Sequence, residues 1–253
     1  MIKAGLRVLA ASGLALALFQ PLPAGAHEIK VFASRVTKIA LQVLGPDYEK
    51  ASGNKLVVID DVAVVMKRRI EAGEAFDLAV LVDYQTDDLV KSGHLVGDTR
   101  VTIMHSGTGV SIKRGAAKPD ISTVAAFKKT LLDAKSITYL AEGASTTHVA
   151  RAFEKLGIAA ALKPKTTLVP TDTVAERVAA GQEELGIGII ANILSVPGVE
   201  LVGPFPAELQ FNIVFSGAIA KNTPHAQDAR DILKLLTSPK AAEIIAARGM
   251  QPG

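Results

Sequence analysis

The sequence predicts an α/β protein of two lobes joined by two chain crossings. Along nearly the whole chain, short apolar segments alternate with segments of helical periodicity, which predicts parallel strands covered by helices. The alternation is interrupted near residues 101–113 and then resumes, as expected where the chain enters a second lobe. A long apolar segment at 211–220 can return the chain to the first lobe before two terminal helices.

The first 26 residues have the features of a secretory signal peptide. Lys3 and Arg7 precede an apolar segment at 8–19, and Ala24-Gly25-Ala26 offers a small-x-small cleavage site. The apolar segment is short for a membrane span. The chain has no Cys, which excludes a lipid-anchored Cys and a disulfide framework. We therefore expect cleavage after Ala26 and a periplasmic mature chain that begins at His27.

The first lobe is expected to contain residues 27–106 and 215–253. Its βα units have strands at 29–32, 55–59 and 77–82 and helices at 36–51, 62–72 and 84–92. Gly53, Gly73 and Gly93 follow these helices, and glycine is the residue that most readily ends a helix. Pro46 lies inside the first helix and is expected to kink it.

The second lobe is expected to contain residues 107–214. Two extended segments at 101–105 and 110–113, separated by Ser106-Gly107-Thr108-Gly109, would carry the chain into it. Its strands are predicted at 136–139, 166–169, 185–190 and 199–202, and its helices at 123–132, 147–156 and 173–180. The terminal helices, at 224–236 and 239–247, each begin with Pro behind a capping hydroxyl, Thr223 or Ser238.

Composition excludes several classes of function. Removing Lys3 and Arg7 from the 28 basic residues leaves 26 against 25 acidic ones, and no basic stripe is present, so we expect no nucleic-acid partner. The sequence has no Gly-rich phosphate loop, no GxSxG elbow and no Cys nucleophile. We expect no cofactor and no metal, because four of the histidines are scattered without metal-ligand spacing: His27, His94, His105 and His225.

The turn between the first strand and the first helix can bind an anion. Ligands of open α/β sheets bind at the carboxyl ends of strands, so the cleft between two such lobes is the expected site. If Ser34 or Thr37 caps the helix, other first-turn N–H groups remain for an anion, together with the positive end of the helix dipole. Arg35 can add a charged fork. The competing interpretation is an ordinary capped βα turn.

A second set of donors follows the strand at 136–139. Ser145, Thr146 and Thr147 bring hydroxyls beside the N–H groups of a new helix, and the turn at Thr171 repeats the arrangement. For each hydroxyl the alternative role is plain helix capping. Asp60-Asp61 would oppose an anion if both faced the cleft, so at least one is expected to cap a helix.

Several short segments resemble the periplasmic solute-binding proteins of molybdate-type ABC transporters. Tyr48-Glu49-Lys50-Ala51-Ser52-Gly53 is one, and the others lie at 31–34, 70–73, 76–78, 162–165, 181–186 and 236–242. The resemblance implies a type II periplasmic binding fold, in which each lobe is a mixed sheet flanked by helices. Such lobes close about two hinge crossings on a small anion and deliver it to an inner-membrane permease. A monomer is expected for a binding protein of this size.

Departures from that pattern disfavour molybdate. By ungapped alignment, the oxyanion-binding Ser of the family falls on Val36, a Gly-Ser-Ser segment falls on Val62-Ala63-Val64, and a Tyr falls near Ile189. The segments at 115–122, 127–131, 134–139 and 195–203 are more similar to a divergent branch of the family that includes periplasmic aconitate isomerase. This similarity favours an organic di- or tricarboxylate.

Three hypotheses of function follow. The first is a binding protein for a small anion, a carboxylate or alternatively molybdate or tungstate. Its contact residues would be Ser34, Arg35, Ala63, Ser145, Thr146, Thr147 and Thr171. The second is an isomerase that moves a double bond in a tricarboxylate, with His148 or Glu142 as the proton carrier. The third is a structural or interaction role, which an exposed apolar patch at the cleft would favour.

Overall fold

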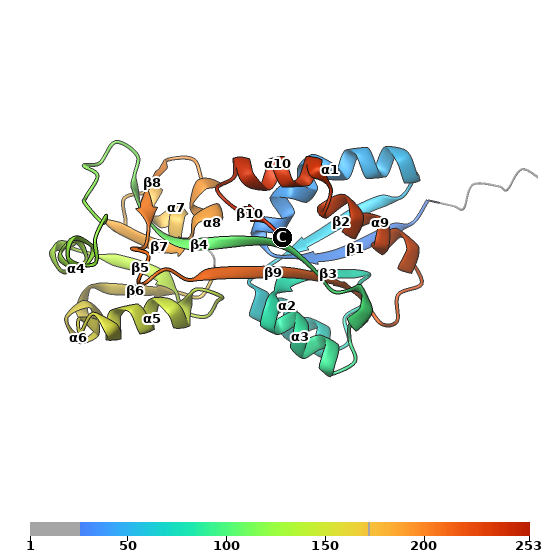
Figure 1. Ribbon diagram of the computed structural model, residues 1–253, viewed down its shortest axis with the longest axis horizontal. Helices are drawn as coiled ribbons and strands as arrows, with labels where there is room; N and C mark the ends of the chain where they lie inside the picture. Colours follow the sequence, from blue (N-terminus) through green and yellow to red (C-terminus); the bar gives the residue numbers. More distant parts are fainter. Residues whose placement is uncertain (1–25, 172) are drawn as a thin grey trace, which may run out of the picture.

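A computed structural model describes residues 26–171 and 173–253, without the side chain of Val36. The predicted signal peptide, except for Ala26, lies outside the described residues. None of the helices in the described part has the length and apolar character needed to cross a membrane. The described chain folds into two lobes that share one continuous order of paired strands, β2-β1-β3-β9-β4-β7-β5-β6 (Figure 1).

The first lobe is built on three parallel strands and one antiparallel strand. The parallel strands are β1 (Glu28–Ala33), β2 (Lys55–Asp60) and β3 (Leu78–Val82), and β9 (Asn212–Ile219) lies antiparallel beside β3. The helices that follow the parallel strands are α1 (Arg35–Ser52), α2 (Ala63–Glu71) and α3 (Asp83–Lys91). The terminal helices α9 (Ala226–Leu236) and α10 (Pro239–Ala247) pack on α1. β3 is buried along its whole length, as its uninterrupted apolar sequence predicts.

The second lobe alternates short strands and helices. Its parallel strands are β5 (Ile137–Leu140), β6 (Thr166–Val169) and β7 (Leu185–Ile189), while β8 (Val199–Pro204) pairs antiparallel with β4 (Val101–Lys113). The helices are α4 (Val124–Asp133), α5 (Thr146–Lys155), α6 (Ala159–Leu162), α7 (Val174–Ala179) and α8 (Ile190–Leu194). Two 3₁₀ turns lie at Gly97–Thr99 and Lys163–Lys165, and the last strand, β10 (Gln251–Pro252), pairs with β4.

Strand β4 joins the lobes without the predicted interruption. It is one strand of 13 residues, so the expectation of two extended segments separated by Ser106-Gly107-Thr108-Gly109 is wrong. Its first part pairs with β9 and its second part, from Thr108 on, pairs with β7. Gly109 is needed for close packing rather than for a turn, because a Cβ there would lie 2.9 Å from the carbonyl oxygen of Gly203.

The returning chain is tied to β4 by one side chain. The Gln210 Oε1 atom accepts a hydrogen bond from the Thr108 N–H at 2.9 Å, and Gln210 Nε2 donates to the Thr108 carbonyl at 2.9 Å. The two segments that connect the lobes are therefore fastened to each other where β4 changes partners. Figure 1 shows β4 and β9 running lengthwise between the lobes.

Glycines and capping hydroxyls near the ends of helices determine where several helices begin or end. Gly53, Gly73 and Gly93 follow their helices with φ between 76° and 88°, in the left-handed region that glycine favours. Ser238 caps α10 as predicted, but Thr223 does not cap α9. That helix begins at Ala226, because the Thr223 hydroxyl donates to the Asp77 carboxylate and accepts from the His225 N–H instead.

Candidate ligand site between the lobes

Strand-to-helix turns of both lobes meet at a small cavity. Its volume is about 40 Å³, close to the ~30 Å³ that one water molecule occupies in the liquid. A solute larger than a few water molecules therefore enters only if the lobes move apart. The cavity is lined from the first lobe by Ser34, Arg35, Asp61, Val62, Ala63, Val82 and Phe215, and from the second by Leu140, Ala144, Ile189 and Asn192.

Helix α1 begins at this cavity without a side-chain cap. Ser34 occupies the N-cap position, but its hydroxyl lies 3.1 Å from the Thr37 hydroxyl and makes no cap hydrogen bond. The expectation that one of these residues caps the helix is wrong, because both hydroxyls are buried and bind each other. The N–H groups of the first turn have no partner within the helix, so they can donate to a bound anion.

Helix α2 starts at the same cavity in the same way, and α5 starts next to the lining residue Ala144. Val62 stands at the N-cap of α2 and has no side-chain acceptor. Ser145 stands at the N-cap of α5 without a cap hydrogen bond, and the neighbouring Thr146 hydroxyl donates to the Leu140 carbonyl at 2.9 Å. By contrast, Thr123 caps α4, which lies away from the cavity. Two uncapped helix starts of the first lobe therefore line the cavity, and an uncapped helix of the second lobe begins beside it.

Two ion pairs bridge the lobes beside the cavity. Arg35 Nη1 on α1 lies 2.7 Å from Glu176 Oε1 on α7, and the two side chains are 31% and 42% exposed. Arg68 Nη2 on α2 lies 3.1 Å from Glu142 Oε2, and both of these side chains are largely exposed. Glu176 therefore binds the guanidinium of the lining residue Arg35 from the other lobe.

Neither aspartate at the end of β2 caps a helix, contrary to expectation. The Asp60 carboxylate accepts from Lys38 Nζ at 2.6 Å, and Asp61 Oδ1 accepts from the N–H of the next residue, Val62, at 2.7 Å. Because Val62 is itself the N-cap of α2, Asp61 lies outside the helix and lines the cavity. Its negative charge at the cavity wall disfavours an anion, whereas the Arg35 guanidinium at the same wall favours one.

The structure brings part of the predicted site together. Ser34, Arg35 and Ala63 line the cavity, whereas Ser145 is buried directly behind the lining residue Ala144. The other predicted contacts are outside the lining: Thr146 is half-buried, and Thr147 and Thr171 are exposed. All seven contacts remain predictions.

Sequence reasoning missed two polar groups of the site. Asn192 follows strand β7 in the first turn of α8, so the strand-to-helix rule applied to the Arg35 turn would also have found it. Glu176 gave no signal, because its partner Arg35 is 141 residues away.

The two candidate proton carriers lie outside the cavity lining. The His148 ring stacks on Phe211, with ring centroids 3.3 Å apart and planes at 13°. Burial, with a smaller contribution from the charge of Arg151, lowers the pKa of His148 below its ordinary value, so the imidazole is neutral at pH 7. Glu142 is held on the surface by Arg68.

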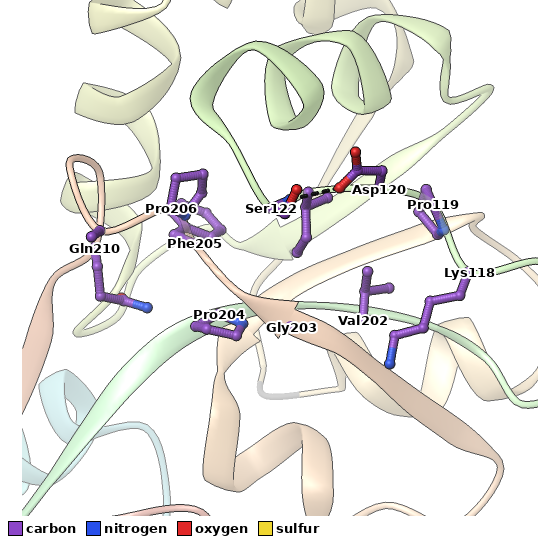
Figure 2. Close-up of a pocket in the computed structure, with 12 residues that line it drawn as sticks. Lys118, Pro119, Asp120, Ser122, Val202, Gly203, Pro204, Phe205, Pro206 and Gln210 are labelled. Carbon is purple, nitrogen blue, oxygen red and sulfur yellow. Dashed lines mark hydrogen bonds between the residues drawn. The ribbon is translucent and has the colours of Figure 1, made fainter.

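A larger hollow of about 750 Å³ lies elsewhere, on the second lobe (Figure 2). Pro119, Pro204, Phe205 and Pro206 form much of its wall. The Asp120 carboxylate at its edge accepts the Ser122 N–H at 2.9 Å, and this hydrogen bond holds the pKa of Asp120 below its usual value. The hollow is open and mainly apolar, so it lacks the convergent donors of the cavity between the lobes.

A two-lobe α/β fold with a cavity lined by helix starts is the fold of a protein that encloses a small solute. The chain belongs to the bacterial extracellular solute-binding proteins, whose family model matches residues 29–251.

Individual relatives agree with this assignment. An aconitate isomerase of a Pseudomonas species is 32% identical over 218 residues, which cover 84% of this chain and 83% of the relative. The molybdate-binding protein ModA of Escherichia coli is 24% identical over 265 residues, 98% of each chain. The periplasmic molybdate-binding protein of Azotobacter vinelandii superposes with a TM-score of 0.71 at 20% identity, over 89% of this chain and 99% of that one. The resemblance to molybdate-type binding proteins and the two-lobe fold are thereby confirmed.

Proposed function

We propose that the chain is the periplasmic solute-binding component of an ABC importer, and that its lobes close on a small organic di- or tricarboxylate. One observation carries the proposal: helices α1 and α2 begin without side-chain caps at a cavity beside Arg35, and the opposite wall includes Ala144, next to the uncapped start of α5. Anions are stabilised at such helix starts by N–H donors and the helix dipole.

Arg35 is the residue that would distinguish a carboxylate. A guanidinium binds a carboxylate through two parallel hydrogen bonds, which is stronger than a contact with a neutral donor. The ligand carboxylate replaces Glu176 at Arg35 when it enters. Molybdate is less favoured, because Val62, Ala63 and Ile189 offer no side-chain donors to a tetrahedral oxyanion. The similarity to an aconitate isomerase supports the same ligand class.

The remaining parts of the proposal concern processing and assembly. Cleavage after Ala26 releases a monomer whose first lobe comprises residues 27–106 and 215–253 and whose second lobe comprises 107–214. The lobes move about the crossings that Gln210 and Thr108 fasten together. The closed, loaded form then meets a permease in the inner membrane.

An isomerase acting in the same cleft is the second candidate. The aconitate isomerase relative favours it. The lowered pKa of His148 suits a group that accepts a proton, but its ring stacks on Phe211 outside the cavity lining, so the lobes would have to move for it to reach a substrate. Turnover of cis- to trans-aconitate that is lost in His148→Ala or Glu142→Ala would support this candidate. Absence of turnover in the unmutated protein would exclude it.

A thermal-shift panel tests the proposed ligand class. The ligands are molybdate, tungstate, sulfate, phosphate, citrate, cis- and trans-aconitate, tricarballylate, succinate and adipate. A ligand at 100 times its Kd adds about 2.7 kcal/mol, which corresponds to roughly 5–10 °C in a chain of this length. We expect shifts with the carboxylates and not with molybdate.

Arg35→Gln provides the matched test of the site. We expect it to abolish the carboxylate shift, whereas Arg230→Gln, an exposed position on α9, keeps it. A shift with molybdate and tungstate alone would show that backbone donors suffice for an oxyanion, and the proposed ligand class would then be wrong.

A further inference from the structure

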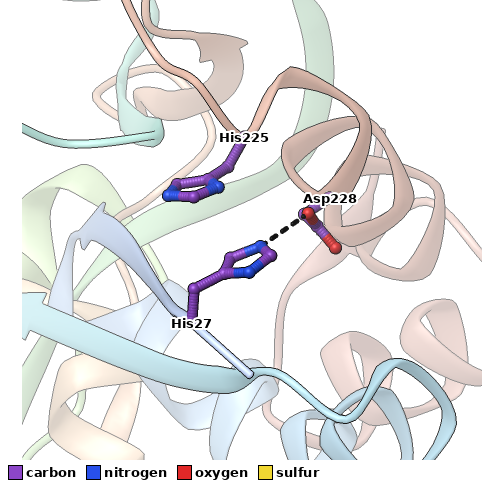
Figure 3. A group of neighbouring side chains, drawn as sticks. All are labelled: His27, His225 and Asp228. Atoms are coloured by element: carbon purple, nitrogen blue, oxygen red, sulfur yellow. Dashed lines mark hydrogen bonds and ion pairs between the residues drawn. The ribbon is translucent and has the colours of Figure 1, made fainter. Parts of the chain in front are cut away.

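We infer that His27, His225 and Asp228 form a binding site for a divalent transition-metal ion on the first lobe (Figure 3). His27 directly precedes β1, His225 stands at the N-cap of α9, and Asp228 lies in the first turn of that helix. One ligand atom from each of the three residues lies within 4.8 Å of the others. No local sequence pattern predicts the site, because these ligands come from opposite ends of the chain.

The ligand types fit zinc and its neighbours. Two imidazoles and one carboxylate are typical zinc ligands, and the Irving–Williams order places nickel and copper among the competing ions. Magnesium and calcium prefer oxygen-only sites, so they are disfavoured. With metal–nitrogen distances of ~2.0–2.1 Å, tetrahedral ligand atoms stand about 3.3 Å apart. His27 Nε2 and Asp228 Oδ2 are already 3.2 Å apart.

The imidazole rings of His27 and His225 lie side by side, so two candidate metal ligands are close together. Their rings stack with centroids 4.1 Å apart and planes at 14°. Each imidazole has a ring nitrogen that can serve as a metal ligand, so the stacked pair brings two such groups close together. One nitrogen of each ring already lies within 4.8 Å of the other and of an Asp228 carboxylate oxygen.

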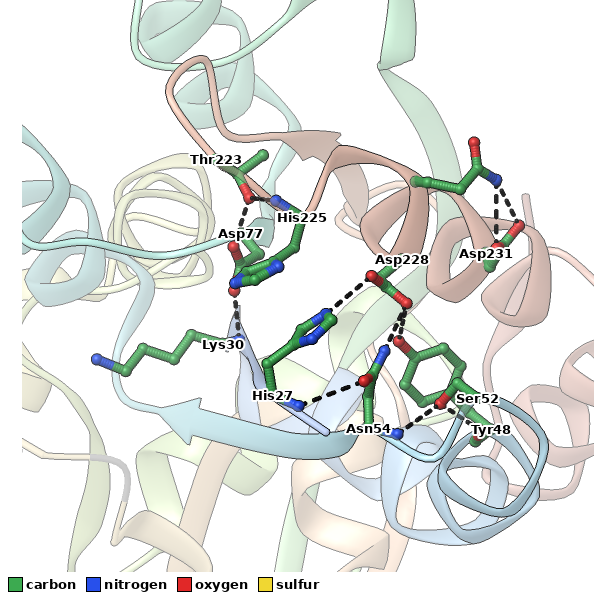
Figure 4. Close-up of polar contacts among 11 residues, drawn as sticks. His27, Lys30, Tyr48, Ser52, Asn54, Asp77, Thr223, His225, Asp228 and Asp231 are labelled. Atoms are coloured by element: carbon green, nitrogen blue, oxygen red, sulfur yellow. Dashed lines mark hydrogen bonds and ion pairs between the residues drawn. The ribbon is translucent and has the colours of Figure 1, made fainter. Parts of the chain in front are cut away.

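The third ligand is oriented by residues behind it. Asp228 Oδ1 accepts hydrogen bonds from the Tyr48 hydroxyl at 2.9 Å and from Asn54 Nδ2 at 2.8 Å, which leaves Oδ2 directed at His27 (Figure 4). Burial alone would raise the pKa of Asp228, but the hydrogen bonds from His27, Tyr48 and Asn54 outweigh it and hold the pKa below its usual value. Such outer hydrogen bonds are a regular feature of metal sites.

An ion can reach the three ligands from solvent. The side chains of His27 and Asp228 are 30% and 24% exposed, and His225 also lines an adjoining hollow of about 420 Å³. A water molecule in that hollow can complete a tetrahedral shell. The nearby Asp77 does not compete for the ion, because its carboxylate accepts from the Lys30 N–H and the Thr223 hydroxyl. The Lys30 side chain is directed away from the ligands in Figure 4.

The metal site and the cavity between the lobes are separate. None of the three ligands is among the residues that line that cavity. A bound ion would link the beginning of the first lobe to α9, so it stabilises that lobe and leaves solute affinity unchanged. The metal site does not depend on the proposed solute, and its failure would not count against the proposed function.

Zinc titration of the exported protein tests the inference. The protein is purified from the periplasmic fraction with a C-terminal tag that contains no histidine, stripped with a chelator, and titrated with Zn²⁺ by calorimetry. We expect one Zn²⁺ per chain, at least tenfold weaker binding in His225→Ala, and binding within twofold of the unmutated protein in His94→Asn. His94 also lines the adjoining hollow but is not among the three ligands, which makes it the matched control.

Histidine NMR keeps the inference falsifiable if His225→Ala is poorly folded. In the unmutated protein, Zn²⁺ should shift the ring resonances of His27 and His225 and leave those of His105 and His148 in place. No binding by the unmutated protein, equal binding in well-folded His225→Ala, or lost binding in His94→Asn would each overturn the assignment. If the unmutated protein does not bind Zn²⁺, the His27–Asp228 contact serves only to hold the N-terminal strand against α9.

Discussion

Replacing Glu176 by Gln should tighten the binding of a carboxylate ligand. Glu176 Oε1 lies 2.7 Å from Arg35 Nη1, and in the proposed mechanism the ligand must displace it. Both side chains are about a third or more exposed, so solvent screens the pair to about 0.2–1 kcal/mol. Gln keeps the shape of the side chain but removes the charge. The ligand then no longer has to break an ion pair in order to bind Arg35. Its binding free energy improves by the roughly 0.2–1 kcal/mol of that pair, so its Kd should fall by about 1.5- to 5-fold.

Calorimetry with trans-aconitate or tricarballylate at two salt concentrations measures the effect. The Debye length is about 10 Å at 0.1 M salt and about 3 Å at 1 M, so the gain in affinity should shrink at high salt. Glu142→Gln, which breaks the other bridge between the lobes, is the control and should change affinity less, because Arg68 does not line the cavity. A rise in Kd for Glu176→Gln would refute the reasoning, since Glu176 would then assist binding rather than compete with the ligand.

Three further predictions concern stability and protonation. In an NMR titration, His148 should have a pKa below its ordinary value of about 6.5. Its contribution to the free energy of unfolding is complete above about pH 6.5 and is lost as the pH falls, because the unfolded chain is protonated first. A His148 contribution that grows toward pH 5 would contradict its burial. Asp228→Asn should lower the free energy of unfolding at pH 7, and this loss should diminish below about pH 4. The reason is that a lowered pKa stabilises the folded state only where the carboxyl is ionised. Urea unfolding that shows the same loss from pH 7 to pH 3 would contradict the prediction. Gln210→Ala removes two hydrogen bonds to Thr108 and should cost about 1–3 kcal/mol in urea unfolding, against little change for the exposed control Gln227→Ala.

Much of the fold could be predicted because its signals are local. Apolar periodicity, glycines with positive φ after helices, and Pro239 behind a capping Ser238 each act within a few residues. The exception was β4, where Ser106-Gly107-Thr108-Gly109 has the composition of a loop but forms a strand. Gly109 is required there by the backbone of Gly203, which is distant in sequence, so no local pattern could reveal its role.

The site could be predicted only in part for the same reason. The rule that ligands bind at strand-to-helix turns found Ser34, Arg35 and Ala63, which do line one cavity. It could not find Glu176, because that residue matters through a partner in the other lobe. The cluster of His27 with His225 likewise depends on the packing of β1 against α9.

A structure of the mature protein with bound trans-aconitate tests the central claim most directly. We expect a ligand carboxylate on the Arg35 guanidinium, within hydrogen-bond distance of the first-turn N–H groups of α1, with Glu176 displaced. An intact Arg35–Glu176 pair with the ligand bound elsewhere, for example in the hollow beside α4, would contradict the account.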